Sequence, residues 1–158
     1  MWNEQIIMML LEGIKDTLYM TLTSTLIGYV IGLPMGILLT VTDKDGIHPN
    51  AAVYKVLDVI ANLIRSVPFL ILLIVLIPFT RFLIGRSYGP TATIVPLVIA
   101  AAPYIARMVE SSLKEVDAGV IEAARSMGAS NFTIVTKVML VEARTSLIVG
   151  ATISLGTI

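Results

Sequence analysis

The sequence predicts an all-α membrane protein: one transmembrane helix bundle over residues 1–158. Apolar residues make up 56% of the chain and charged residues 14%, whereas a soluble domain is about 45–50% apolar and about 25% charged. The apolar residues also gather in long uncharged runs, as helices crossing about 30 Å of hydrocarbon require. From these runs we expect three full spans and a partial fourth.

The first span is expected at residues 17–42, which carry no charge. A helix of that length measures about 39 Å, enough to cross the bilayer with some tilt. Gly28, Gly32 and Gly36 recur in it at four-residue intervals. Small residues at this spacing let two helices approach closely, so we predict a helix-packing face. The partner helix could belong to the same chain or to a second copy.

The second span is expected at residues 57–80, although its uncharged part, 66–80, is only about 22 Å long. Asp58, Asn62 and Arg65 lie four and three residues apart and therefore share one face of a helix entering the membrane from its surface. Pro68 and Pro78 are expected to kink the rest of this span.

This segment also holds a candidate translocation path or gate, formed by Asn62, Arg65, Ser66 and Pro68. In the functional interpretation, the proline bend gates the path and Asn62 faces it. In the structural alternative, Arg65 anchors the helix at the head groups, Pro68 ends it, and Asn62 hydrogen-bonds a neighbouring helix. The sequence leaves both open.

The third span is expected at residues 87–106, which are uncharged and about 30 Å long as a helix. Residues 107–144 then hold ten of the 22 charged residues and form a structured loop. Residues 145–158 are apolar again but reach only about 21 Å, so they are expected to form part of a fourth span. A partial copy or a transport-inactive fragment is therefore one hypothesis.

The distribution of basic residues predicts the orientation in the membrane, since cytoplasmic loops carry the excess of Lys and Arg. Eight basic residues fall on the side of the loops at 43–50 and 107–144, and three on the other. We therefore expect a multi-pass protein with both loops in the cytoplasm and the N-terminus outside.

The charged loop is predicted to be a helix, a glycine turn and a second helix. Val120, Ile121, Ala124 and Met127 share one face of the first helix. Gly128 suits a left-handed C-cap, and Ser130 or Asn131 can cap the second helix. The alternative is a helix lying on lipid, but small alanines and a face poor in Lys and Arg favour docking of a partner protein.

Glu122, Ala123 and Ala124, followed by Gly128, Val138 and Leu140, resemble the coupling motif of bacterial ABC-importer permeases. Val141 departs from it by replacing a proline. The resemblance implies a type I importer permease fold whose short cytoplasmic coupling helix docks on a separate ATP-binding subunit through Glu122, Ala123, Ala124 and Gly128. It further implies that ATP and Mg bind to that subunit and not to this chain.

Four more blocks are similar to the methionine-importer permease family: 32–36, 65–69, 77–81 and 102–110. This resemblance implies import of methionine across the bacterial inner membrane by alternating access. The implied partners are the ATPase, an extracytoplasmic methionine-binding protein, a second copy of the permease and membrane lipid. A permease for another small solute, such as a polar amino acid, is the alternative.

Several function classes are excluded or unsupported by the sequence. The chain has no cysteine, and its one histidine, His48, lies in a polar loop, so we predict neither a metal site nor catalytic residues. It has no phosphate-binding glycine loop, and we therefore expect no enzyme. The net charge of zero gives no reason to expect nucleic acid as a partner.

Overall fold

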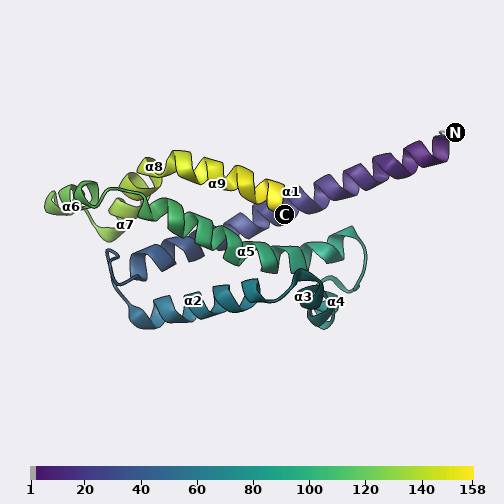
Figure 1. Ribbon diagram of the computed structural model, residues 1–158, viewed down its shortest axis with the longest axis horizontal. Helices are drawn as coiled ribbons and strands as arrows, with labels where there is room; N and C mark the ends of the chain where they lie inside the picture. The colour runs from purple at the N-terminus through teal and green to yellow at the C-terminus, as the bar shows by residue number, and fades with distance from the viewer. Residues whose placement is uncertain (1–2) are drawn as a thin grey trace.

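The computed structural model describes residues 3–158, and every regular element in that part of the chain is a helix (Figure 1). Residues 1 and 2 of the predicted domain lie outside the described residues. In chain order the elements are α1 (Glu4–Thr42), α2 (Ala51–Ser66), α3 (Phe69–Val75), α4 (Ile77–Ile84), α5 (Pro90–Lys114), α6 (Ala118–Ser126), α7 (Asn131–Thr133), the π-helix η1 (Ile134–Met139), α8 (Leu140–Glu142) and α9 (Arg144–Thr157).

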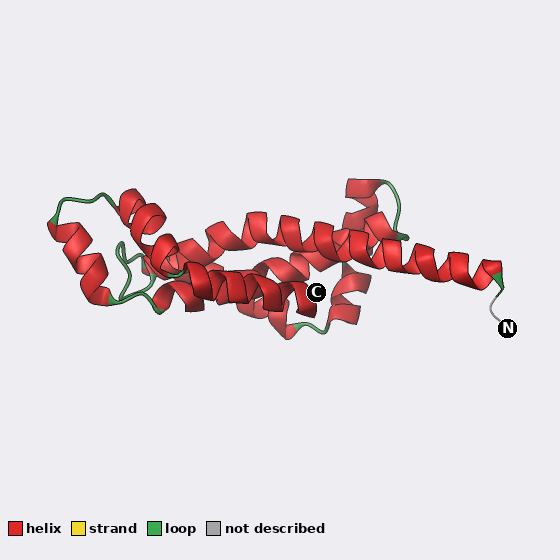
Figure 2. Cartoon of the chain, turned by 90° about the horizontal axis from the view of Figure 1, so that it is seen from above, coloured by secondary structure: helices red, strands yellow, loops and turns green. Residues whose placement is uncertain are grey.

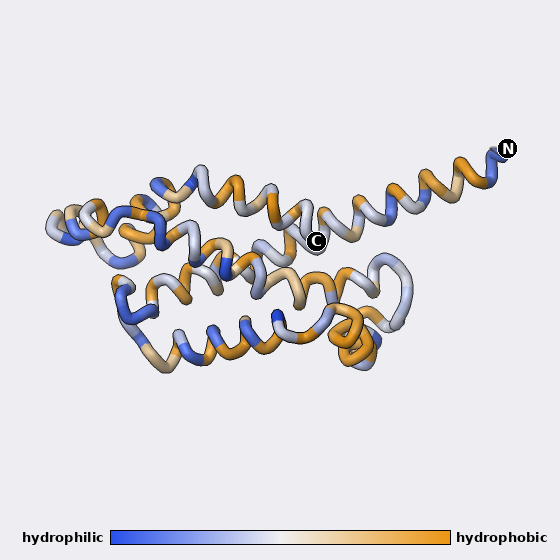
Figure 3. Tube along the Cα trace, viewed as in Figure 1, coloured by the Kyte–Doolittle hydropathy of each residue, from blue (hydrophilic) through white to orange (hydrophobic). Residues whose placement is uncertain are grey.

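Within the described residues, two helices, α1 and α5, have the length and apolar character needed to cross a membrane. Two pairs of helices joined at a bend would each make one further crossing if both members of the pair belong to a single span, which gives up to four spans. These pairs are α2 with α3, bent by 104°, and Asn131–Glu142 with α9, bent by 71°. Colouring by hydropathy shows many apolar residues along α1, α5 and α9 and in α3 and α4, and polar residues near α6 (Figure 3).

The glycine stripe of α1 packs against α5 of the same chain. Gly28, Gly32 and Gly36 are all buried. A Cβ atom at Gly32 would lie 2.8 Å from the carbonyl oxygen of Ala102, and one at Gly36 would lie 2.6 Å from that of Ala106. Only glycine permits this backbone approach, so the stripe fixes how α1 lies against α5.

Proline positions explain how the segment after α2 breaks. The helix ends at Ser66, Val67 is extended, and Pro68 becomes the N-cap residue of α3, because a proline disfavours helical geometry in the residue before it. Pro78 lies in the first turn of α4, where its missing N–H removes no helical hydrogen bond. The two prolines thus divide this segment into α2, α3 and α4.

α5 is the central helix of the bundle, with contacts to α1, α2, α3, α4 and α9. It lies between α2 and α9 in Figure 1 and continues through Pro96 and Pro103 to Lys114. The N-terminal part of α1 extends beyond the other helices in both views (Figures 1 and 2), and its apolar side chains are exposed. α6 lies at the opposite end of the molecule.

Candidate functional site: a capped helix at the polar end of the bundle

α6 is held in place by a cap at each end. At its start, the Asp117 carboxylate accepts a hydrogen bond of 2.6 Å from the backbone N–H of Gly119. At its end, Gly128 has a φ of +81°, and the N–H groups of Gly128 and Ala129 bond the carbonyls of Arg125 and Ala124. These two bonds form a Schellman motif, which requires the left-handed conformation at Gly128.

The second helical segment begins where the sequence predicts, with the Ser130 hydroxyl accepting from the N–H of Thr133. It then widens into the π-helix η1 before α8. Ile134 and Met139 in η1 are buried, whereas Phe132 is 77% exposed, although Phe132 and Met139 are seven residues apart and would share one face of an α-helix. A π-helix shifts the angular position of the residues around it, so strict α-helical spacing does not hold here.

The four motif residues do not all face the same way. Glu122 and Ala123 are exposed, while Ala124 is only 6% exposed and belongs to the buried cluster that includes Leu113, Ile134 and Met139. The motif therefore presents Glu122 and Ala123 to solvent and uses Ala124 to attach α6 to the bundle. A bulky residue at position 124 would disturb that internal packing.

The apolar face predicted for α6 is buried only in part. Ala124 is buried and Ile121 is half-buried, but Val120 is 40% exposed and Met127 is 83% exposed. Met127 is the C-cap residue of α6, at the point where the chain turns away towards Gly128. The predicted periodicity therefore ends before it.

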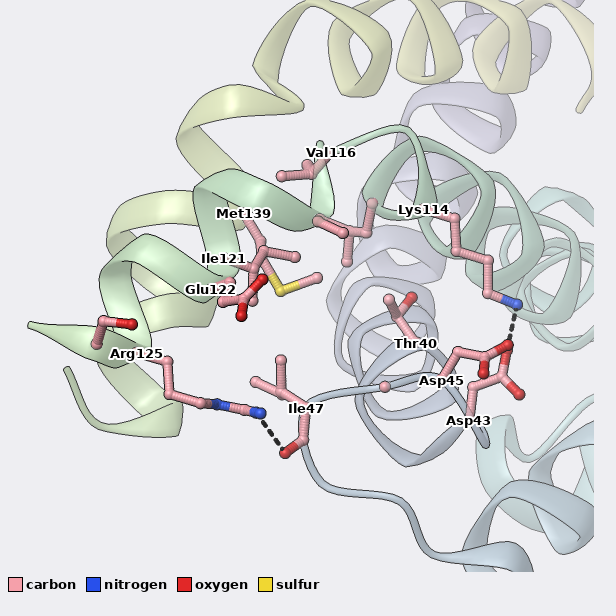
Figure 4. A pocket seen from close by; sticks show the side chains of 14 residues that line it. Thr40, Asp43, Asp45, Ile47, Lys114, Val116, Ile121, Glu122, Arg125 and Met139 are labelled. Atoms are coloured by element: carbon pink, nitrogen blue, oxygen red, sulfur yellow. Dashed lines mark hydrogen bonds and ion pairs between the residues drawn. The ribbon is translucent and has the colours of Figure 1, made fainter. Parts of the chain in front are cut away.

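A groove of about 750 Å³ separates α6 from the α1–α2 loop, residues 43–50 (Figure 4). Its lining includes Asp45 on the loop and Glu122 on α6. Arg125 crosses between the two walls, and its guanidinium donates a hydrogen bond of 2.9 Å to the carbonyl oxygen of Ile47. This contact joins segments 78 residues apart in the sequence, and no local pattern predicts it.

A cluster of charged side chains joins the α1–α2 loop, α2 and α5 beside this groove. Lys114 pairs with Asp43 and with Glu110, at 2.7 Å in each case. Arg107 pairs with Glu110 at 2.8 Å and also with Asp58. Glu110 is 5% exposed, and a buried carboxylate with two cationic partners is compensated for its lost hydration.

The pKa of Asp43 reports the pairing of this residue with Lys114. The hydrogen bond from the Lys114 ammonium holds the pKa of the Asp43 carboxyl below its usual range. The cluster was not predicted from the sequence. Arg107, Glu110 and Lys114 recur at three and four residues, and this spacing was the available signal of a shared helix face.

The four candidate path residues lie at the end of α2 and its break. Asn62 accepts a hydrogen bond of 3.1 Å from Arg107, so it contacts a neighbouring helix as one alternative predicted. Arg65 and Ser66 are exposed, and the Ser66 hydroxyl donates to the Leu63 carbonyl at 2.8 Å. Pro68 marks the 104° bend. The structure thus brings Asn62, but not Ser66, to the charged cluster.

The described residues contain no group of three or more His, Cys, Asp or Glu side chains arranged to hold a metal ion. The arrangement is a capped surface helix that exposes the Glu122 carboxylate and the small side chain of Ala123. It is attached to the bundle by apolar packing and by one long arginine contact.

Residues 7–158 match the family model described as "Binding-protein-dependent transport system inner membrane component". Among curated relatives, the chain is 49% identical over 156 residues to the D-methionine transport system permease protein MetI of Salmonella typhimurium. It is also 49% identical over 156 residues to the protein of that name from Escherichia coli K12. Each alignment covers 99% of this chain and 72% of the relative.

Solved structures agree with these relatives. A chain from the inward-facing MetNI methionine ABC transporter superposes with a TM-score of 0.96 at 49% identity, covering 99% of this chain and 72% of that one. A chain from an amino acid ABC transporter with histidines superposes with a TM-score of 0.69 at 23% identity, covering 98% of this chain and 72% of that chain. The second likeness concerns the fold alone.

Proposed function

Because this chain belongs to the family of binding-protein-dependent transport system inner membrane components, we propose that it is the membrane permease subunit of an ATP-driven methionine importer. Membership of the family confirms the resemblance seen in the sequence blocks. The observation that supports methionine as the substrate is the 49% identity, over 99% of this chain, to permeases named for D-methionine transport.

The permease works with partners that supply what this chain lacks. A separate ATP-binding subunit binds ATP and Mg and hydrolyses the nucleotide, and an extracytoplasmic binding protein delivers methionine. Two copies of the permease form the route, which opens to one side of the membrane at a time. The differential affinity of the ATPase for the two conformations shifts the balance between them.

The permease is proposed to meet its ATPase through α6. Glu122 and Ala123 form the exposed part of the contact, Ala124 fixes α6 on the bundle, and Gly128 turns the chain back. The support for this role is the combination of a short, doubly capped helix with a small exposed side chain at the polar end of the bundle. A small residue leaves room for a partner's surface to come close.

The same proposal places the loop containing α6 in the cytoplasm and the N-terminus outside, in a multi-pass inner-membrane protein. The ends of the bundle support this arrangement, because α6 and the start of α1 lie at opposite ends of the molecule (Figure 1). The residues at the α2 break, Asn62, Arg65, Ser66 and Pro68, are proposed to border the route.

Uptake of labelled methionine tests the function. Cells that carry this chain with its ATPase and binding protein are expected to accumulate methionine, and omission of any one component is expected to abolish the accumulation. Excess unlabelled methionine should compete, whereas a polar amino acid such as serine should not. Equal competition by serine would contradict methionine as the substrate.

A further inference from the structure

The arginine that follows the exposed motif does not point out towards a partner. Arg125 lies on exposed α6, yet its guanidinium reaches back over the groove to the carbonyl oxygen of Ile47 at 2.9 Å (Figure 4). We propose that Arg125 is a positioning residue that fastens α6 to the α1–α2 loop, so that α1 and α2 follow the movements of α6. This inference rests on the proposed docking of α6 on an ATPase subunit.

The rest of the attachment of α6 to the bundle is apolar. Ala124 packs into the cluster that contains Leu113 of α5 and Ile134 and Met139 of η1. On the other side the groove separates α6 from the α1–α2 loop. The Arg125 hydrogen bond spans that separation. A charged donor makes a stronger bond than a neutral one, which suits a contact that must transmit force.

The loop that receives this bond is tightly folded onto the end of α1. The N–H groups of His48 and Asn50 both donate to carbonyls of the last α1 residues, Val41 and Thr42, at 3.0 Å. A Cβ atom at Gly46 would lie 2.4 Å from the Val41 carbonyl oxygen, so the loop backbone contacts the helix end directly. A displacement of the Ile47 carbonyl therefore moves the end of α1.

The loop is also joined to α2 and α5. The Asn50 side chain accepts a hydrogen bond of 3.3 Å from the N–H of Val53 and so caps α2. Asp43, at the start of the loop, pairs with Lys114 of α5 at 2.7 Å. Through the one carbonyl of Ile47, Arg125 thus connects α6 to a rigid junction of α1, α2 and α5.

The transporter assembled with its ATPase and binding protein in liposomes provides the test, with Arg125→Gln as the variant. We expect normal co-purification of the ATPase and continued ATP hydrolysis. The methionine transported per ATP hydrolysed should fall at least about tenfold, the effect expected from losing a hydrogen bond from a charged donor. Lys137→Gln, which removes an exposed basic residue of the same loop, is the control and should leave that ratio unchanged.

The outcomes separate this inference from the docking on which it rests. Loss of ATPase co-purification with Arg125→Gln would make Arg125 a contact of the partner and overturn the positioning role, while leaving docking by α6 intact. An unchanged ratio of methionine to ATP would also overturn it. The docking itself is tested separately by Ala123→Trp. Normal co-purification of the ATPase with that variant would contradict docking by α6, whatever the result for Arg125→Gln.

A covalent replacement gives a readout that loss of folding does not produce. The chain has no cysteine, so Ile47→Cys with Arg125→Cys introduces the only two thiols of the permease. Joining them with a flexible linker about as long as an arginine side chain should restore the ratio that the unlinked double variant has lost. If the linker instead arrests transport, the two positions must separate during the cycle, and the positioning role is wrong.

Discussion

Two adjacent alanines of α6 have opposite surroundings. Ala123 is exposed, whereas Ala124 is buried against η1 and the end of α5. The coupling resemblance treats them as one docking pair, but only Ala123 is available to a partner in this chain. Substitutions at the two positions therefore report on different properties: association for Ala123 and internal packing for Ala124.

Ala123→Trp is predicted to weaken association with the ATPase at least about fivefold, because overpacking a close contact costs roughly 1–3 kcal/mol. The side chain has open solvent around it in the isolated permease, so insertion and folding should be preserved. Co-purification of the tagged ATPase from membranes measures the effect. Ala52→Trp, at another exposed alanine near the same end of the bundle, is the matched control, and equal ATPase recovery from the two variants would contradict docking at Ala123.

At the scale of elements, the packing of α1 on α5 depends on the glycine stripe. The Cβ of an alanine at position 36 would lie 2.6 Å from both the Ala106 carbonyl oxygen and the Val109 Cβ. Backbone atoms cannot move aside as a flexible side chain can, so the two helices must separate. Because α5 contacts all the other long helices, this separation would spread through the bundle.

Gly36→Ala is accordingly expected to destabilise the permease by roughly 1–3 kcal/mol, as overpacking of a core does. Thermal unfolding in detergent, followed by circular dichroism, measures the change. Gly13→Ala is the control in the same helix, because a Cβ there meets nothing within 4 Å and alanine favours the helix. If the Gly36→Ala variant unfolds at the same temperature as the Gly13→Ala variant, this close approach does not hold α1 and α5 together.

Local sequence patterns predict these elements well and the contacts between them poorly. The uncharged runs and the proline at position 68 predict where helices lie and break, and the Gly128 turn follows from its place after an amphipathic segment. The pairing of Arg107 with Asp58 joins residues 49 apart, and that of Arg125 with Ile47 joins residues 78 apart. No local periodicity encodes such distances. The burial of Ala124 depends on η1, whose π-helical turn the spacing also does not predict.

At the scale of the whole molecule, the bundle has a polar end and an apolar body. The ionic cluster, the α1–α2 loop, the groove and α6 all lie at the polar end, joined by the contacts of Lys114 and Arg125. The start of α1 and the loop between α4 and α5 lie towards the other end (Figure 1). An ATPase can act on this bundle only if the polar end faces the cytoplasm.

Single cysteines test that orientation, since the chain has none of its own. Glu122→Cys should react with a membrane-impermeant maleimide in inside-out vesicles and stay unlabelled in intact spheroplasts. Gln5→Cys and Tyr88→Cys, both at exposed positions, should show the reverse, because α1 and α5 have the length and apolar character to cross the membrane once each and the proposal places their starts outside. The excess of basic residues near α6 gives the physical reason for this direction of insertion. Labelling of position 122 from outside, with positions 5 and 88 labelled from inside, would put α6 beyond the reach of any cytoplasmic motor.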